Sequence, residues 1–377
     1  MLLMHKDKIV AELSMRGSVI ADVNVVDMDE MPIGVDRRPA LTLNSLNKWL
    51  HGRSIPQERQ GISSIEKALG CSISDAAIKA IAVSLTDCYW VKENDSSLRW
   101  KDVNYHDNGF SESLYNVVVK HEEVEISDFR LPDITTDGTL EKTWAYSNGV
   151  PILLKRGQTP DCKQNLLSAN EVVVSEISSR LGFACAEYFL RVVNTGEVVC
   201  ASPCFVHNPE NEYVSAYQIQ NQYRVFREDL YDWFVFSGFG KEMKDMLYLD
   251  HLVHNTDRHE KNFGVIRSAE SGNILRMAPI FDSGSCLDWN GLGNSYQYDA
   301  KPFFDDRYEQ LKLLSSEDVK DRHSLPLEML TTIIHDIYEQ FGIPGKQTED
   351  AVRCISSSYS ELSKIAKNRI FVESINI

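Results

Sequence analysis

Residues 254–284, HNTDRHEKNFGVIRSAESGNILRMAPIFDSG, constrain the fold of this 377-residue chain more than any other feature. The segment carries Asp257 and Asn262 five positions apart, and Asp282 follows twenty positions after Asn262. Between them, the apolar run FGVI, a Ser-Gly-Asn turn, and the apolar residues IL and PIF predict a β-hairpin. A short loop followed by a tight hairpin can bring all three side chains together.

Such a set of oxygen-bearing side chains is typical of a site that holds a magnesium-nucleotide beside a hydroxyl acceptor. Phosphoryl transfer needs a carboxylate at the acceptor hydroxyl and hard oxygen ligands for Mg²⁺. We expect Asp257 to be the catalytic carboxylate, and Asn262 and Asp282 to be the metal ligands. Arg258 and His259 are expected to act as catalytic donors near the transferring phosphate.

Two other interpretations of the same block were weighed. His251, His254 and His259 could hold zinc, but the i, i+4 spacing and the glutamate of the HExxH type are absent. Asp and Asn also cap helices and turns, so the block could be purely structural. The lysine strand and glutamate helix that precede it favour phosphoryl transfer over both.

The apolar strand VPILLK ends at Lys155, where an ammonium group can lie beside phosphate oxygens. The helix that follows carries Glu171, sixteen positions later, and a carboxylate there would fix the lysine and keep it charged. Glu176 on the same helix is the second choice. The alternative is a surface lysine at a strand end.

A turn at Asp137-Gly138, within LPDITTDGTLEKTW, precedes the lysine strand and is expected to cover the nucleotide phosphates. The chain has neither a GxGxxG nor a GxxxxGK motif. An ordinary surface turn is the competing interpretation.

The composition narrows the classes of partner. A formal net charge of −16 opposes direct binding to nucleic acid or to an anionic membrane, and no apolar run approaches the length of a membrane span. The first residues lack the apolar core of a signal peptide. Eight scattered cysteines without a CxxC pair indicate reduced thiols and a cytoplasmic protein, although export into another cell is left open.

The pattern of residues predicts two lobes. Residues 1–205 are expected to form the N-terminal lobe, with a helical and irregular extension over 1–125 and a nucleotide-binding sheet and helix over 126–205. Residues 206–377 are expected to form a mostly helical C-terminal lobe that contains the catalytic loop. The predicted fold class is therefore α+β.

Local signals place the elements of the first lobe. Residues 41–84 have helical spacing, and Asn148-Gly149 predicts the turn of a hairpin. The helix NEVVVSEISSRLG should stop at Gly182, and two more strands should flank residues 194–196.

The chain resembles the HipA-like serine/threonine kinases, the toxin kinases of bacterial toxin–antitoxin pairs and their solitary relatives. The resemblance lies in HNTDRHEKNFG and PIFDSGS, and extends to TTDGTLEKTW, PILLKRG and NEVVVSEISSRLG. Three further segments look like the solitary-kinase branch: LNKWLHGRSIPQERQGI, LTDCYWVK and KPFFDDRYEQLKLL, of which residues 301–306 lie outside the described residues.

This resemblance implies a two-lobed atypical protein-kinase-like fold that uses ATP and Mg²⁺ to phosphorylate Ser or Thr on a protein. By motif, Asp257 would be the catalytic Asp, Asn262 and Asp282 the metal ligands, and Lys155 the nucleotide lysine. The segment VCASPCF would be the adenine-contacting hinge, with Ser202 and Cys204.

The resemblance also implies regulation. Members of the family autophosphorylate a hydroxyl in the phosphate-binding loop, and Thr135 and Thr136 lie at the comparable place. An antitoxin or another regulator would be a partner beside the protein substrate. Two alternatives remain open at this point, namely a catalytically silent nucleotide-binding module and a kinase of small molecules or lipids.

Overall fold

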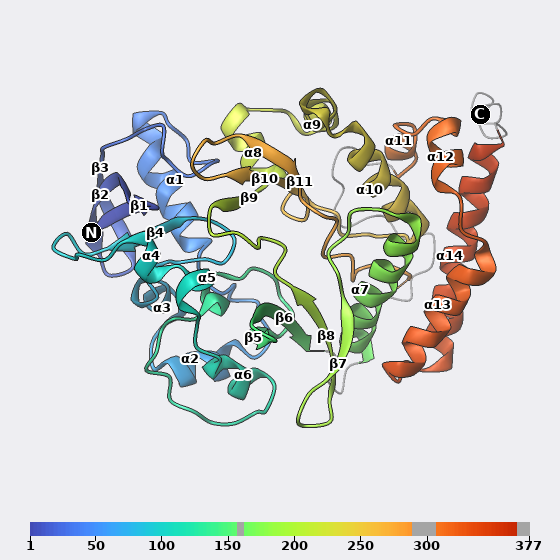
Figure 1. Ribbon diagram of the computed structural model, residues 1–377, viewed down its shortest axis with the longest axis horizontal. Coiled ribbons are helices and arrows are strands. Elements are labelled where there is room, and N and C mark those ends of the chain that lie inside the picture. The colour runs from blue at the N-terminus through green and yellow to red at the C-terminus, as the bar shows by residue number, and fades with distance from the viewer. Residues whose placement is uncertain (157–161, 289–306, 368–377) are drawn as a thin grey trace. The chain divides into compact units, whose positions relative to one another are not determined.

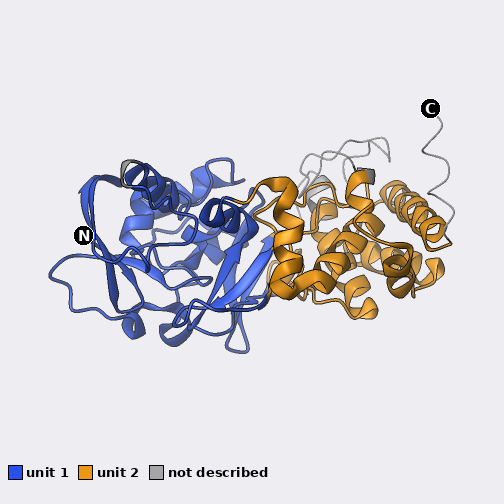
Figure 2. Cartoon of the chain, turned by 90° about the horizontal axis from the view of Figure 1, so that it is seen from above, with its two compact units in different colours: residues 1–155, 203–224, 264–276 blue, residues 156–202, 225–263, 277–377 orange. Residues whose placement is uncertain are grey.

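The structure is a computed structural model that describes residues 1–156, 162–288 and 307–367 (Figure 1). It has the predicted mixture of strands and helices. The chain forms two compact units, each assembled from three stretches of the sequence (Figure 2): unit 1 contains residues 1–155, 203–224 and 264–276, and unit 2 contains residues 156–202, 225–263 and 277–377. This division differs from the expected boundary at residue 205, because residues 156–202 cluster with the later helices.

Unit 1 begins with an antiparallel sheet in the order β3-β2-β1-β4. Its strands are β1 Leu2–His5, β2 Lys8–Arg16, β3 Val19–Val25 and β4 Tyr89–Lys92. The expectation of only helical and irregular structure over 1–125 was therefore wrong. The signal was present in β2, where Leu13 is buried between the exposed Glu12 and Ser14.

Helices cover this sheet and complete the core of unit 1. α1 Pro39–His51 packs against β3, so that Leu46 and Leu50 join Leu3 and Val91 in one buried cluster. The other helices of the extension are α2 Ile62–Leu69, α3 Ile73–Lys79, α4 Trp100–Val103, α5 Tyr105–Asn108, α6 Ser113–Val118 and the 3-10 turn η1 Pro132–Thr135. The prediction of helices over 41–84 is confirmed.

Two predicted hairpins are present in unit 1. β5 Lys142–Ser147 pairs with β6 Val150–Arg156, and Asn148 and Gly149 have φ of 52° and 79°, as a two-residue type I′ turn requires. β10 Gly264–Ser268 and β11 Ile274–Met277 form the hairpin that was predicted between Asn262 and Asp282. β10 also pairs with β9 Asn211–Ser215, which leads into α8 Ala216–Tyr223.

Unit 2 is built mainly from helices around α7 Cys162–Leu181, which ends before Gly182 as predicted. The predicted strands are β7 Phe189–Val192 and β8 Val198–Pro203, an antiparallel pair. The remaining elements are η2 Arg227–Asp229, α9 Leu230–Phe234, the π-turn η3 Val235–Phe239, α10 Gly240–Leu252, α11 Arg307–Leu311, α12 Ser316–Arg322, α13 Leu327–Gln340 and α14 Gly345–Ala366. α13 packs against α7 and α14, and lies beside α14 in Figure 1.

Over the described residues, no helix is both long and apolar enough to span a bilayer.

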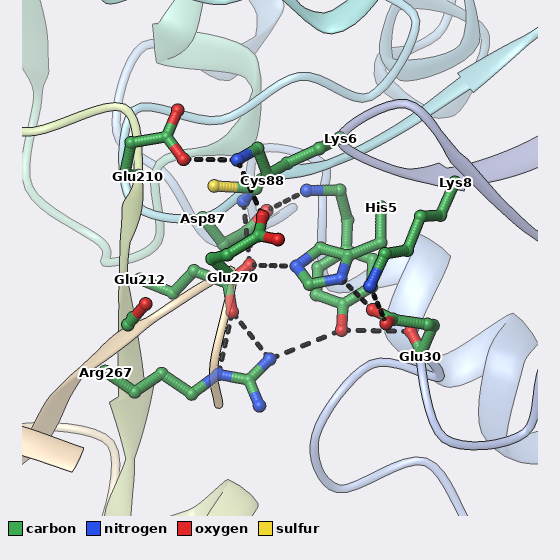
Figure 3. Close-up of polar contacts among 12 residues, drawn as sticks. His5, Lys6, Lys8, Glu30, Asp87, Cys88, Glu210, Glu212, Arg267 and Glu270 are labelled. Atoms are coloured by element: carbon green, nitrogen blue, oxygen red, sulfur yellow. Dashed lines mark hydrogen bonds and ion pairs between the residues drawn. The ribbon is translucent and has the colours of Figure 1, made fainter. Parts of the chain in front are cut away.

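Within unit 1, a buried polar cluster joins the sheet of β1–β4 to the strands β9 and β10 (Figure 3). His5 at the end of β1 lies between two carboxylates, with Nδ1 2.6 Å from Glu30 Oε2 and Nε2 3.1 Å from Glu212 Oε1. Arg267 on β10 donates from Nε to the other oxygen of Glu212 at 2.7 Å. Tyr89 stacks on the His5 ring with centroids 4.4 Å apart. Both ring nitrogens face carboxylate oxygens, so the geometry favours the imidazolium form.

Burial alone would lower the pKa of His5, but hydrogen bonds and attraction from Glu212 and Glu30 outweigh it, so the pKa lies above 6.5. A raised folded-state pKa gives stability that is fully present below the unfolded-state pKa and is lost as pH rises through the folded value. We therefore expect His5→Gln to lower the free energy of unfolding more at pH 6 than at pH 9, as measured by urea titration.

The matched control is His335→Gln, which changes an exposed histidine on α13. A loss of stability in His5→Gln that is equal at both pH values would contradict a charged His5.

Candidate functional site

The loop that contains Asp257 follows α10 and is bonded to the segment around Asp282, all within unit 2. The backbone N–H of Thr256 and its hydroxyl both donate to the carbonyl of Ser285, at 2.9 and 3.0 Å. Asn255 donates from Nδ2 to Asp250 Oδ1 at 2.8 Å, and its own Oδ1 accepts from the N–H of Asp257 at 3.1 Å. The start of the loop is thus fixed to α10 and to residues 281–286.

Arg258 holds these two segments together from inside the unit. It is 1% exposed, and Nε and Nη2 donate to the two oxygens of Asp250 at 2.9 and 3.0 Å. Nη1 donates to the carbonyls of Asn262 and Phe281 at 2.8 and 2.6 Å, and Nη2 also donates to Ser283 Oγ at 2.8 Å. These five bonds match the five N–H donors of a guanidinium.

This arrangement differs from the role expected for Arg258 beside the transferring phosphate. Its donors are engaged with protein groups, so the side chain positions the loop instead of facing a ligand. Burial opposes the charge on Arg258, but the attraction of Asp250 outweighs it and raises its pKa above the usual value. The bonds formed by Asp250 could not be found from sequence spacing alone.

The backbone of the loop folds so that Asp257, His259 and Asn262 lie on one turn. The carbonyl of Asp257 accepts from the N–H of His259 at 3.0 Å and from Asn262 Nδ2 at 3.2 Å. With its amide nitrogen used in this way, Asn262 presents Oδ1 as an acceptor. His259 Nδ1 accepts from the N–H of Lys261 at 3.2 Å, which leaves Nε2 to carry the proton of the neutral ring.

Asp282 has a left-handed backbone with φ of 55°, which is unusual for a residue other than glycine. Bonds on both sides enforce it: the N–H of Asp282 donates to Tyr188 OH at 3.2 Å, and Arg258 binds the carbonyl of Phe281. The next N–H, of Ser283, donates to Glu171 Oε2 at 3.2 Å. Strain that is held by surrounding bonds is frequent at functional sites.

The middle of α7 supports the segment around Asp282. Asn170 donates from Nδ2 to the carbonyls of Gly284 and Cys286 at 2.9 and 2.7 Å, and accepts from Tyr338 OH. A Cβ at Gly284 would lie 2.8 Å from the carbonyl of Leu167, so a side chain does not fit there. The sequence analysis did not single out Asn170, because its bonding partners Gly284 and Cys286 lie 114 and 116 residues away in the chain.

Lys155 and Glu171 are both buried, at 4% and 2% exposure, which is rare for charged side chains. Lys155 lies near the end of β6, as predicted, opposite Lys142 of β5. Glu176 instead forms an ion pair with Arg180 at 2.7 Å on the surface of α7. The pairing of Lys155 with Glu171 stays a prediction.

The loop with Asp137 and Gly138 is held by a residue that the sequence did not single out. Arg59, 2% exposed, donates from Nε to the carbonyl of Gly138 at 2.7 Å and from Nη2 to that of Thr136. The N–H of Gln60 donates to the carbonyl of Thr139 at 2.9 Å. The extension therefore clamps this loop within unit 1.

Both candidate hydroxyls for autophosphorylation are engaged. Thr135 Oγ1 donates to the carbonyls of Val83 and Pro132, at 3.3 and 3.2 Å. Thr136 Oγ1 donates to the carbonyl of Pro132 and accepts from Trp144 Nε1, both at 2.8 Å. Phosphate transfer to either residue would require the loop to leave these bonds.

The hinge candidates Ser202 and Cys204 are buried, at 7% and 5% exposure. The N–H of Cys204 donates to the carbonyl of Pro151 at 3.0 Å, and burial raises the pKa of its thiol to about 11. Seven cysteines with described side chains are free thiols, as expected.

Nothing in the described part of the chain supports the alternative of a zinc site. His251 Nε2 lies 3.1 Å from Glu361 Oε2, and no group of three or more His, Cys, Asp or Glu suited to a metal is found there.

The chain has a kinase-like α+β fold, which the comparison with solved structures shows. HipA of Shewanella oneidensis MR-1, solved with HipB and operator DNA, matches with a TM-score of 0.55 at 14% identity, over 98% of each chain. The proinflammatory kinase CtkA of Helicobacter pylori matches with a TM-score of 0.50 at 18% identity, over 61% of this chain and 94% of CtkA.

Neither a protein-family model nor a curated protein matches the sequence. The predicted resemblance to HipA-like kinases is thus confirmed at the level of the fold.

Proposed function

We propose that the protein is an ATP- and Mg²⁺-dependent kinase that phosphorylates Ser or Thr on a protein. The observation that carries the proposal is the buried Arg258, whose bonds join the loop of Asp257 and Asn262 to the segment of Asp282. The fold shared with HipA and CtkA supports the same class of reaction.

The donor set fits a magnesium ion. Asn262 offers a neutral oxygen and Asp282 a charged one, and hard oxygen donors of this kind suit Mg²⁺. When bound, the ion would neutralise charge on the phosphate oxygens. Asp257 would orient the acceptor hydroxyl and accept its proton, and His259 would donate from Nε2 toward the phosphate. Arg258 positions these groups without touching the nucleotide.

The other nucleotide contacts follow the sequence-based expectations. Lys155 would bind the phosphates, with Glu171 fixing its side chain. Ser202 and Cys204 would border the adenine. Asp137 and Gly138 would cover the phosphates, which gives Arg59 a role in the affinity for ATP.

We expect Arg59→Gln to weaken the binding of Mg-ATP by about 10- to 100-fold, because hydrogen bonds from a charged donor contribute about 1.5–3 kcal/mol. Isothermal titration calorimetry measures this loss. The matched control is Arg130→Gln, which removes a surface arginine of unit 1 that pairs with Asp128 at 2.7 Å. Equal affinities of Arg59→Gln and the control would show that the clamped loop does not contact the nucleotide.

Regulation by a partner is part of the proposal. The structural relative HipA was solved with HipB, and an antitoxin or another regulator of this kind would bind the present chain. Self-modification at Thr135 or Thr136 would release the loop from its bonds to Pro132 and Trp144 and so lower the affinity for ATP.

ADP formation separates this function from a silent nucleotide-binding module. Both would raise their melting temperature with Mg-ATP. The kinase should also form ADP when a mixed protein acceptor such as casein is added, and should do so only with Mg²⁺ present. A thermal shift without ADP would favour the silent module, and ADP formed with glycerol or lipid vesicles but not with protein would favour a small-molecule or lipid kinase.

A further inference from the structure

Two phenylalanines beside the catalytic loop are unusually exposed. Phe236 is 89% and Phe226 is 73% exposed, whereas Phe234 between them is fully buried. Phe236 lies in the π-turn η3, where Gly238 has a φ of 95°. Large aromatic side chains exposed in one short segment mark an interaction surface more often than isolated apolar residues do.

The same segment carries three exposed carboxylates, Glu228, Asp229 and Asp232. Among the described residues, none of the three forms an ion pair or a side-chain hydrogen bond. Phe226, Phe236 and the three carboxylates lie within one short segment that spans η2, α9 and η3, and we call their exposed side chains the 226–236 patch. The basic residue of this segment, Arg227, is paired with Glu260, so the exposed side chains of the patch are mainly aromatic and acidic. Such a surface is complementary to a segment that carries basic and apolar side chains.

The patch is continuous with the catalytic loop inside unit 2. Arg227 Nε lies 3.9 Å from Glu260 Oε1, three residues after Asp257. The ring of Phe234 contacts that of Phe263, with centroids 5.5 Å apart, and Phe263 directly follows Asn262. A protein segment held on the patch would therefore lie near the proposed catalytic carboxylate.

We propose that the 226–236 patch binds the protein substrate through a segment with Lys or Arg and large apolar residues near the acceptor hydroxyl. This inference rests on the proposed kinase function and adds the class of substrate. Phe226 and Phe236 supply the apolar contacts, and the three carboxylates select for basic residues and against acidic ones.

Binding of labelled peptides tests the patch without requiring catalysis. Two fluorescent peptides of equal length are titrated with the full chain, each with one central Ser flanked by either Arg and Leu or Glu and Gly. Fluorescence anisotropy should show binding of the Arg/Leu peptide, which weakens as salt rises. It should show no comparable binding of the Glu/Gly peptide.

The variant Phe226→Ser/Phe236→Ser should weaken binding of the Arg/Leu peptide about tenfold or more, as truncation of aromatic anchors does. Replacing the three carboxylates by Glu228→Gln, Asp229→Asn and Asp232→Asn should weaken binding and flatten its dependence on salt. The matched control is Val192→Ser, a 60% exposed apolar residue of β7 in the same unit, which should bind as the unaltered chain does.

The inference would be overturned if the two peptides bind alike, if neither binds, or if the double variant retains the affinity of Val192→Ser. These outcomes are distinct from failure of the kinase function. A chain that forms ADP with casein but shows no peptide selectivity loses only the docking surface. A chain that binds the Arg/Leu peptide through the patch but forms no ADP loses the proposed function alone.

Discussion

Asp257→Asn should lower the rate of phosphate transfer from ATP to protein by about 10²–10⁴-fold, the usual contribution of a general base. Asparagine keeps the size of the side chain but cannot accept the proton of the acceptor hydroxyl. The variant should stay folded, because asparagine has the shape of aspartate and the backbone bonds of residue 257 are unchanged. Transfer of radiolabelled γ-phosphate to casein measures the effect.

Asp336→Asn is the matched control, since it removes an exposed carboxylate on α13 of the same unit. It should transfer phosphate at the rate of the unaltered chain. Asp282→Asn should also lose transfer, and part of that loss should be recovered at high Mg²⁺ concentration because a metal ligand is weakened. Transfer by Asp257→Asn at the rate of Asp336→Asn would remove Asp257 from the mechanism.

Arg258→Met should lower the free energy of unfolding by about 3–5 kcal/mol, because it leaves the buried carboxylate of Asp250 without its partner. It also removes the donors that bind Phe281 and Ser283. Guanidinium chloride titration measures the loss. Phosphate transfer should fall in parallel at temperatures where the variant is still folded, since Asp282 loses its support.

A surface arginine provides the comparison. Arg180→Met removes an exposed i, i+4 pair with Glu176 on α7 and should change stability by no more than about 0.5 kcal/mol. The double variant Asp250→Asn/Arg258→Met should be more stable than Arg258→Met, because no unpaired charge is then buried. If Arg258→Met is no less stable than Arg180→Met, the guanidinium does not join the two segments.

Local signals made the hairpins and several helices predictable from the sequence. Asn148 and Gly149 both accept positive φ at low cost, so the turn between β5 and β6 is specified by two residues. The helix α7 and its end at Gly182 were predicted in the same way, from apolar periodicity and a glycine.

The first sheet was missed because its central pairing is not local. β1 is buried along its whole length and so lacks the alternation that marks a half-buried strand. It pairs with β4, which places His5 opposite Tyr89. The extension contributes both this sheet and Arg59, which donates a hydrogen bond to the carbonyl of Gly138. Both depend on contacts between residues that are distant in the sequence, so neither could be predicted from local patterns.

The sequence predicted which residues form the candidate site, but it did not predict how the surrounding side chains pack. Spacing indicated that Asp257, Asn262 and Asp282 belong together, and the structure bonds the segments that carry them. Spacing could not reveal that Arg258 turns inward, because its direction depends on Asp250 of α10 and Ser283. Buried partners of this kind are set by tertiary packing, which leaves no periodic trace in the sequence.

Mass spectrometry of the purified chain and of added casein, after incubation with Mg-ATP, tests the central claim most directly. The account predicts new phosphate on Ser or Thr of casein, and on Thr135, Thr136 or a neighbouring hydroxyl if the chain modifies itself. Omission of Mg²⁺ or the Asp257→Asn change should abolish it. Two results would contradict a protein kinase built on this loop. In the first, the chain binds Mg-ATP but neither casein nor the chain itself gains phosphate. In the second, the Asp257→Asn variant gives as much phosphate as the unaltered chain.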